Sequence, residues 1–160
     1  MKKVIVLFVI LLTSQLGFTQ ELVKLDFSDF ENTQLMKTKN LENFKYLATK
    51  AEVGVAYIEE NGIKTYNTEN GIKLIRVTSD AIDGLNQSLK FSSSVEMIII
   101  DILKPNFNIK TIDCSKLKQF GNLKYIYFRY QIDIKNNSEL QKFDCLPVQV
   151  KQYYTKQLAS

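Results

Sequence analysis

Residues 95–103 read VEMIIIDIL. The consecutive Ile98, Ile99 and Ile100 place apolar side chains on both faces of an extended chain, because successive strand residues point to opposite sides of a sheet. A strand that is apolar on both faces is typical of a sheet covered on both sides. Pro105 ends the segment, since proline cannot continue the hydrogen-bond ladder. We therefore expect a buried central strand here.

Five further strands are predicted around this segment. Alternating apolar residues or short apolar runs place them at 53–58, 63–67, 72–78, 109–113 and 123–134. Asn61-Gly62 and Asn70-Gly71 separate the first three strands, and Asn-Gly favours tight turns because both residues accept a positive φ. The simplest interpretation of these three strands is an antiparallel meander.

Three short helices are predicted at 40–50, 80–90 and 115–120, where apolar residues recur every three or four positions. Asn40 is expected to cap the first of them. Residues 148–158 fit either a strand or a final helix. No linker divides the chain after residue 20, so we expect a single domain of the α/β or α+β class.

An apolar template recurs along the chain. Residues 72–77 (IKLIRV), 95–100 (VEMIII) and 123–128 (LKYIYF) fit L-x-x-L-x-L with other apolar residues in place of Leu, at steps of 23 and 28 residues. A partial copy, Phe44-Lys-Tyr-Leu47, begins 28 residues before the first. Residues 72–134 thus resemble a short, degenerate leucine-rich-repeat array. The resemblance implies parallel strands with template residues in the core and the intervening residues on an open face.

The array departs from the family pattern. Leu103 and Gln131 stand where the second and third copies would carry the asparagine of the family's ladder. Residues 109–114 also fit the template, but they begin only 14 residues before Leu123. Because any alternation of strands and helices produces aliphatic triplets at such spacings, a compact α/β or α+β domain without repeats is the alternative.

The first nineteen residues have the parts of a bacterial secretory signal. Lys2 and Lys3 give a positive start, residues 4–12 are an unbroken apolar run of nine, and small residues precede the expected cleavage site. The run is too short for a membrane span, which needs about 20 apolar residues. We therefore predict a signal peptide at 1–19, a mature domain at 20–160, and a periplasmic or secreted protein of a Gram-negative bacterium.

Charge argues against nucleic acid as a partner, and hydropathy argues against a membrane anchor in the mature chain. The chain has 21 basic and 17 acidic residues, and two of the basic ones lie in the signal segment, which leaves a mature net charge of +2. Nucleic-acid binding needs a clustered basic stripe, which this sequence lacks. No later segment is long and apolar enough to span a bilayer, so we expect no transmembrane anchor in the mature chain.

Cys114 and Cys145 are the only cysteines. In an oxidising compartment they form one possible disulfide, which would close a loop of about 30 residues. Two buried free thiols are the alternative, because a sequence does not supply the Cβ geometry that the bond requires.

The chain contains no histidine. Its absence excludes Ser-His-Asp triads, Cys-His dyads and nearly all zinc-binding patterns. The acidic pairs Glu59-Glu60 and Asp80/Asp83 lie at a turn and at a helix start, where carboxylates are normally solvated or act as caps. We therefore expect no enzymatic activity, no cofactor and no metal site.

The densest aromatic cluster reads YIYFRY at 125–130. On the sheet face opposite the core we expect a set of aromatic, aliphatic and arginine side chains: Tyr125, Tyr127, Arg129, Arg76 and Ile99. Aromatic and arginine side chains are the usual anchors of protein interfaces. Burial of the rings beneath a helix is the alternative.

These observations predict an exported, non-catalytic recognition protein of the bacterial envelope that presents a β-sheet face. Its partner would be a protein or another envelope component. The alternative from another class is a small envelope enzyme or small-ligand-binding α+β domain that uses carboxylates.

Overall fold

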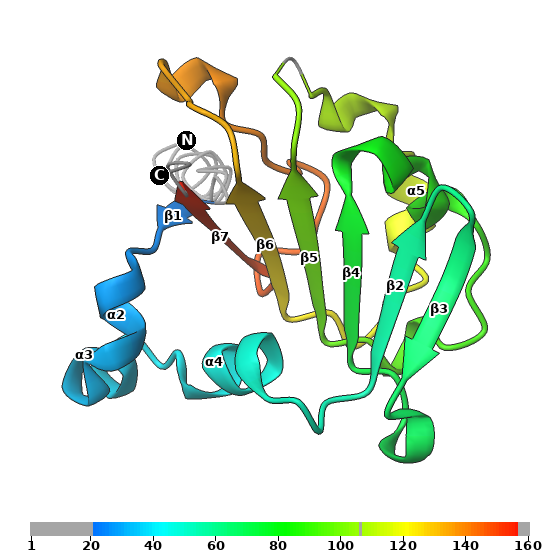
Figure 1. Cartoon of the computed structure of the whole chain (residues 1–160), viewed down its shortest axis with the longest axis horizontal. Coiled ribbons are helices and arrows are strands. Elements are labelled where there is room, and N and C mark those ends of the chain that lie inside the picture. The colour runs from blue at the N-terminus through cyan, green and yellow to red at the C-terminus, as the bar shows by residue number, and fades with distance from the viewer. Residues whose placement is uncertain (1–20, 106, 157–160) are drawn as a thin grey trace, which may run out of the picture.

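Seven strands form one mixed sheet in the order β1-β7-β6-β5-β4-β2-β3 (Figure 1). The computed structural model describes residues 21–105 and 107–156, so the predicted signal peptide at 1–19 lies outside the described residues. The strands are β1 (Leu22–Lys24), β2 (Val55–Glu59), β3 (Gly62–Tyr66), β4 (Leu74–Thr78), β5 (Met97–Ile102), β6 (Tyr125–Tyr130) and β7 (Lys151–Lys156). With its short helices the sheet makes a small α/β domain, as the sequence predicts.

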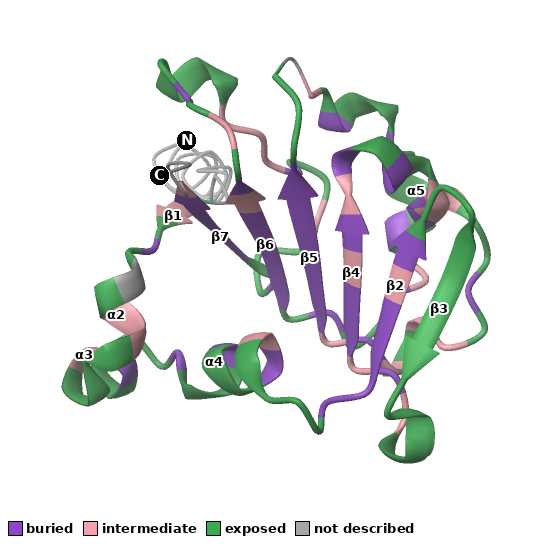
Figure 2. Cartoon of the chain, in the orientation of Figure 1, coloured by how far each residue is buried: buried purple, intermediate pink, exposed green. Residues whose placement is uncertain are grey.

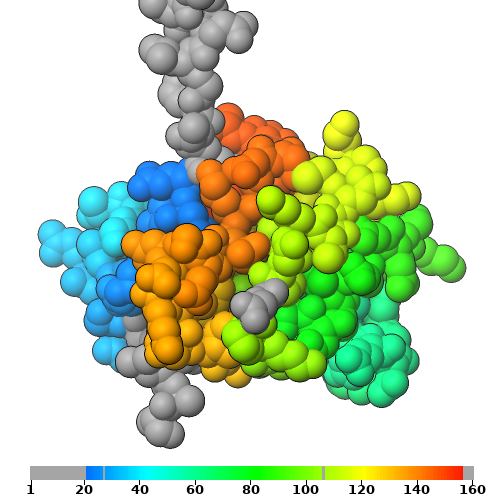
Figure 3. All heavy atoms as spheres, turned by 90° about the horizontal axis from the view of Figure 1, so that it is seen from above, coloured from blue at the N-terminus to red at the C-terminus, as the bar shows by residue number. Residues whose placement is uncertain are grey.

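The helices are short. The α-helices are α2 (Phe27–Glu31), α3 (Thr33–Thr38), α4 (Glu42–Thr49) and α5 (Cys114–Leu117), and the 3₁₀ helices are η1 (Thr68–Asn70), η2 (Ser79–Asn86), η3 (Ser92–Ser94), η4 (Ile109–Thr111) and η5 (Asn137–Glu139). Viewed from above, the blue and cyan N-terminal segment and the green and yellow segments lie on opposite sides of the molecule (Figure 3). The orange segment lies between them.

The four strands β4, β5, β6 and β7 are neighbours in chain order, and each pair is parallel. β1 adds a parallel strand next to β7, whereas β3 is antiparallel to β2 at the other edge. Residues 148–158, which fitted either a strand or a helix, contain strand β7. Figure 2 shows the contrast in burial between the purple strands β5, β6 and β7 and the green edge strand β3.

The predicted meander is half wrong. β2 and β3 form the expected hairpin, but β4 pairs with β2 in parallel, on the side away from β3. The chain from β3 to β4 crosses the start of β2 at Gly54, where a Cβ would collide with the carbonyl oxygens of Gly71 and Asn67. Asn67 and Gly71 both have positive φ, 54° and 77°, which Asn and Gly tolerate and which turn the chain across β2.

Two rows of inward-facing side chains run across five adjacent strands. One row comprises Ala56, Ile75, Ile98, Ile126 and Gln152, and the next comprises Ile58, Val77, Ile100, Phe128 and Tyr154. Every member is buried. The rows align the second and third template positions of all three predicted copies and add β2 and β7 to them. Phe44 and Leu47 of the partial copy lie instead on α4.

The crossovers after β4, β5 and β6 pack on this inward face. Leu85 of η2, Leu117 of α5 and Phe143 before β7 all belong to the same apolar cluster as the two rows. Gln152 is the polar exception among the row residues, and its fully buried amide exchanges hydrogen bonds with the backbone N–H and C=O of Phe143, at 2.8 and 2.7 Å. The amide is therefore satisfied within the core.

Several predicted elements are corrected. The strand expected at 109–113 is the 3₁₀ helix η4, because Ile109 and Ile112 both turn into the core at a spacing of three, where a strand would need two. The helix expected at 80–90 is the 3₁₀ helix η2, in which Gly84 packs against Ile58 too closely for a Cβ. The strand predicted at 123–134 spans only Tyr125–Tyr130.

The N-terminal helices differ from the prediction in two ways. α2 and α3 were not expected, although Asn32 caps α3 by accepting hydrogen bonds from the N–H groups of Gln34 and Leu35. Asn40 does not cap α4. It follows Lys39, the C-cap of α3, with a φ of 53°, and Leu41 is the N-cap residue of α4.

The predicted disulfide between Cys114 and Cys145 is present. The two Cα atoms are 6.0 Å apart and the bond spans 31 residues of sequence. It joins the start of α5 to the segment that leads into β7. The bond therefore links the connection between β5 and β6 to the connection between β6 and β7.

Glu96 is a charged link between three strands at their N-terminal ends. Its carboxylate lies 3.1 Å from the Nζ of Lys73 and 2.6 Å from the Nζ of Lys124. Burial alone would raise the pKa of Glu96, but hydrogen bonds from Lys124 and Lys73 outweigh burial and hold the pKa below its usual 4.5. The unfolded chain therefore takes up a proton at higher pH than the folded one, so this stabilisation is present above pH 4.5 and is lost as the pH falls through the folded pKa.

Glu96→Gln should therefore lower the free energy of unfolding at pH 7 by about 1 kcal/mol and flatten its decline between about pH 5 and pH 3. Urea unfolding midpoints measured across this range check the expectation. The exposed Glu60→Gln is the matched control and should leave the slope unchanged. Identical slopes for Glu96→Gln and wild type would contradict this role for the carboxylate.

Candidate ligand-binding groove

The outward face of the sheet is covered only in part. Phe44 of α4 is fully buried, and its ring contacts the rings of Tyr125, Tyr127 and Tyr153 at centroid distances of 5.5, 5.2 and 4.9 Å. Leu47 and Met36 join the same apolar cluster. The N-terminal helices thus seal the middle of this face.

The predicted interface residues do share one face, because Arg76, Ile99 and Tyr127 are direct partners across β4, β5 and β6. Ile99, Tyr127 and Tyr125 are buried, however, with exposed fractions of 1, 4 and 9%. The rings of both tyrosines lie against Phe44 of α4. These three residues therefore do not form a surface that a partner can reach while α4 is docked.

The polar groups of Tyr127 and Arg129 already have hydrogen-bond partners within the protein. The Tyr127 hydroxyl is 3.0 Å from the hydroxyl of Thr155, and burial raises the pKa of the phenol. The Nε and Nη2 of Arg129 donate to the two carboxylate oxygens of Asp101, at 2.5 and 2.6 Å. Arg129 is therefore held by a bidentate ion pair on the sheet face.

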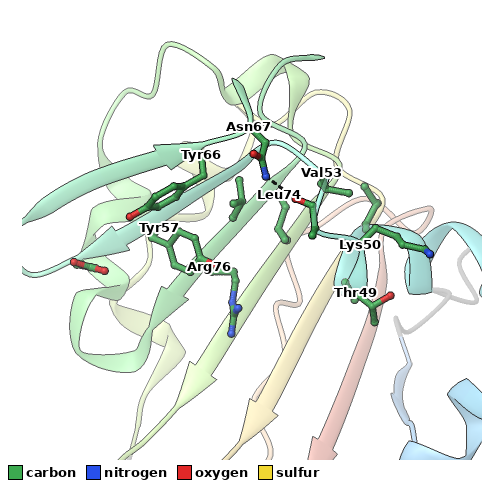
Figure 4. Close-up of a pocket in the computed structure, with 13 residues that line it drawn as sticks. Thr49, Lys50, Val53, Tyr57, Tyr66, Asn67, Leu74 and Arg76 are labelled. Atoms are coloured by element: carbon green, nitrogen blue, oxygen red, sulfur yellow. Dashed lines mark hydrogen bonds between the residues drawn. The ribbon is translucent and has the colours of Figure 1, made fainter. Parts of the chain in front are cut away.

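Among the predicted interface residues, Arg76 lines a cavity. A groove of about 560 Å³ opens on the outward face between the C-terminal end of α4 and the β2–β3 hairpin (Figure 4). Leu47, Val55, Tyr57, Tyr66, Leu74 and Arg76 contribute to its walls. We call this cavity the Arg76 groove. Its size is within the range of about 300–1,000 Å³ that small-molecule sites occupy.

The groove has an apolar floor and one aromatic wall. Val55 and Leu74 are direct partners on β2 and β4, and both are buried. Tyr57 and Tyr66 stand edge to face, with ring centroids 5.6 Å apart and an interplanar angle of 87°. Tyr66 is 53% exposed and belongs to the edge strand β3, so the aromatic wall reaches the surface.

Arg76 lies between the aromatic wall and the Asp101 carboxylate. Its guanidinium carbon is 5.4 Å from the Tyr57 ring centroid, and its Nη2 is 3.6 Å from Asp101 Oδ2, which is too long for a hydrogen bond. The Nε–H of Arg76 is buried and meets no hydrogen-bond acceptor among residues 21–105 and 107–156. Arg76 is therefore a cation whose hydrogen-bonding capacity is incompletely used.

Charge around the groove favours an anion. Asp101 is shared between two guanidiniums and is already engaged by Arg129, so it neutralises Arg76 only in part. Glu59 also lines the groove, but its carboxylate is paired with the ammonium of Lys64 at 2.5 Å. Figure 4 shows the Lys50 side chain directed away from Arg76. Arg76 is thus the main source of positive charge inside the groove.

One end of the groove is fixed by a tether. The side-chain amide of Asn67 donates to the carbonyl oxygen of Ala51 at 2.5 Å, which ties the end of β3 to the loop after α4 (Figure 4). Gly54 lies beneath this crossing. The connection is therefore held by backbone packing as well as by the tether.

The sequence did not single out Tyr57, Tyr66 or Asn67 as site residues. Tyr57 and Arg76 are 19 positions apart and belong to strands whose parallel pairing was not expected. Tyr66 was assigned to the middle strand of a meander, whereas β3 is an edge strand. A signal was present in the spacing, since residues 53–58 (VGVAYI) also fit the apolar template and so place Tyr57 in line with Arg76.

The arrangement is suited to binding. Among the described residues, His, Cys, Asp and Glu form no group of three that could hold a metal ion. Glu96 and Asp113 have lowered pKa values, Glu96 through its two lysines and Asp113 through hydrogen bonds from Ser115. The buried apolar floor, the two tyrosine rings and Arg76 can together bind a ligand through packing and charge.

Comparisons with protein-family models, curated proteins and solved structures found no match for this chain. The leucine-rich-repeat resemblance of residues 72–134 therefore stays a prediction. What the structure adds to it is the register, which aligns the recurring template positions across parallel strands.

Proposed function

We propose that this chain is an exported, non-catalytic recognition protein whose binding site is the Arg76 groove. The observation that carries the proposal is a preformed cavity of about 560 Å³ that combines an aromatic wall with an incompletely paired arginine. A well-formed pocket in which a few polar groups converge beside apolar and aromatic side chains is the usual mark of a binding site. The predicted aromatic face beneath α4 is replaced in this proposal by the neighbouring groove.

A location outside the cytoplasm is part of the proposal. The signal-like residues 1–19 and the disulfide between Cys114 and Cys145 support it, because disulfides persist in oxidising compartments. We infer a periplasmic or secreted protein of a Gram-negative bacterium. Among the described residues, no helix has the length and hydropathy needed to cross a membrane.

The groove can be tested by photo-crosslinking in the envelope. Tyr66→p-benzoylphenylalanine places the crosslinker on the aromatic wall, and we expect it to capture a specific envelope component that Arg76→Ala abolishes. The matched control is Val148→p-benzoylphenylalanine, which is more exposed, at 63% against 53%, but does not line the groove. The same capture from both positions, or capture that Arg76→Ala leaves intact, would contradict the proposal.

A further inference from the structure

We infer that the Arg76 groove binds a ligand that carries a single carboxylate beside an aromatic ring. This inference rests on the proposed function and adds the chemistry of the ligand. Three properties of the groove support it: the positive charge of Arg76 that Asp101 leaves unneutralised, the shape and composition of the walls, and the carboxylates that lie nearby.

The charges around Arg76 favour an anion. Two guanidiniums, those of Arg76 and Arg129, face one carboxylate, that of Asp101, so one positive charge is in excess. Arg129 takes both carboxylate oxygens, which leaves Arg76 at 3.6 Å. The planar fork of an arginine matches carboxylates and phosphates through paired hydrogen bonds. A ligand anion at Arg76 would supply the pairing that Asp101 gives only in part.

The carboxylates near Arg76 favour a ligand carboxylate over a phosphate. Asp101 lies beside Arg76, and Glu59 lines the same groove. A dianionic phosphate would face these two carboxylates with only one cation in excess, and like charges at this range disfavour binding. A monoanion matches the excess charge of the groove, so a carboxylate is the favoured group.

The floor and the aromatic wall of the groove fit an aromatic ring on the ligand. Val55 and Leu74 form an apolar floor, and Tyr57 and Tyr66 form a wall of two rings at 87° to one another. An aromatic ring can pack against this pair in the offset or edge-to-face geometry that aromatic groups prefer. The guanidinium of Arg76 is stacked 5.4 Å from the Tyr57 centroid, so a ring on the wall and an anion on the arginine would lie side by side.

Two sources share this chemistry. One is a free aromatic acid, and the other is the C-terminal residue of a polypeptide, whose backbone carboxylate lies beside its side chain. The edge strand β3 borders the groove and is exposed along its whole length, so it leaves room for a chain that continues beyond the terminal residue. The experiment below separates the two sources.

Isothermal titration of the mature disulfide-bonded chain at pH 7 and low salt is the test. We expect N-acetyl-phenylalanine to bind at least about tenfold more tightly than its amide, which lacks the charge, and than N-acetyl-alanine, which lacks the ring. Arg76→Gln should weaken N-acetyl-phenylalanine binding by at least about tenfold and remove the preference for acid over amide. Lys110→Gln, an exposed residue outside the groove, is the control and should change neither.

Tyr66→Ala provides a second variant that is safe for folding, because the side chain is exposed at the sheet edge. It should weaken the aromatic acid but keep the preference for acid over amide. A pentapeptide ending in Phe with a free carboxylate then identifies the source. At least about tenfold tighter binding than N-acetyl-phenylalanine assigns a polypeptide C-terminus, and equal or weaker binding assigns a free acid.

Equal affinities for acid and amide, or no binding of either at millimolar concentration, would overturn the inference. These results are separable from failure of the proposed function. Capture at Tyr66 that depends on Arg76, together with equal binding of acid and amide, would leave the groove as a recognition site for another ligand. Loss of both the Arg76-dependent capture and the preference for acid over amide would count against the groove as a binding site as well as against the proposed ligand.

Discussion

Phe44→Ala should lower the free energy of unfolding by about 3–5 kcal/mol, the range for loss of a buried phenylalanine. Phe44 is fully buried and is the residue through which α4 contacts three tyrosine rings of the sheet. Removing the ring leaves a cavity between helix and sheet that neither side can close, because the tyrosines are fixed on adjacent strands. Urea or guanidinium unfolding of the disulfide-bonded protein measures the loss.

Tyr46→Ala is the control for this experiment. Tyr46 lies on the same helix but is 45% exposed, so its truncation should change stability by no more than about 0.5 kcal/mol. Phe44→Ala should also increase the binding of a hydrophobic dye, because Tyr125 and Tyr127 would lose their cover. A loss below about 1 kcal/mol for Phe44→Ala would contradict the docking of α4 on the sheet.

Removal of the disulfide is the second large effect. The double variant Cys114→Ser/Cys145→Ser should be less stable than wild type by about 3–4 kcal/mol, the chain-entropy value for a loop closed across 31 residues. The loop contains α5 and strand β6, so the bond restricts the unfolded chain across the centre of the fold. Unfolding curves of the variant and of oxidised wild type measure the difference.

Wild type unfolded under reducing conditions is the internal comparison. Its stability should match that of the double serine variant, because both lack the cross-link and differ only by one atom at each of two positions. Equal stability of oxidised and reduced wild type would show that the bond does not constrain the unfolded chain.

The central strands could be predicted because their pattern and their environment agree. Residues 95–103 are apolar on both faces, and β5 is buried on both, by the crossovers on one side and by α4 on the other. The N-terminal helix at 40–50 was predicted for the same reason, since Phe44 and Leu47 follow a helical spacing. Local patterning was sufficient where a segment buries one consistent stripe or both of its faces.

The errors come from contacts that are distant in sequence. Ile109 and Ile112 look like a strand, but the chain between β5 and β6 must turn back across the sheet, and a 3₁₀ turn buries both residues. The pairing of β4 with β2 depends on the close approach of Gly54 to Gly71 and Asn67, which no local pattern reveals. Asn-Gly at 70–71 correctly indicated a turn, but β4 after this turn pairs in parallel with β2 and does not pair with β3.

The candidate site could be predicted only in part. Arg76 was selected correctly as an outward-facing residue, because alternation along a strand fixes the face of each side chain. Whether that face is open depends on where α4 ends. It ends at Thr49, so the outward face over β5 and β6 is covered, whereas the outward face over β2 and β4 is open. Burial of Tyr125, Tyr127 and Ile99 follows from the same helix.

The most direct test of the Arg76 groove is a nuclear magnetic resonance titration of the ¹⁵N-labelled mature chain with N-acetyl-phenylalanine. We expect saturable shifts confined to the groove, at Tyr57, Tyr66, Asn67 and Arg76, and we expect Arg76→Gln to need at least about tenfold more ligand to saturate them. Shifts centred on the opposite face, around α5 and the disulfide, or no saturable shifts at millimolar ligand, would contradict this expectation.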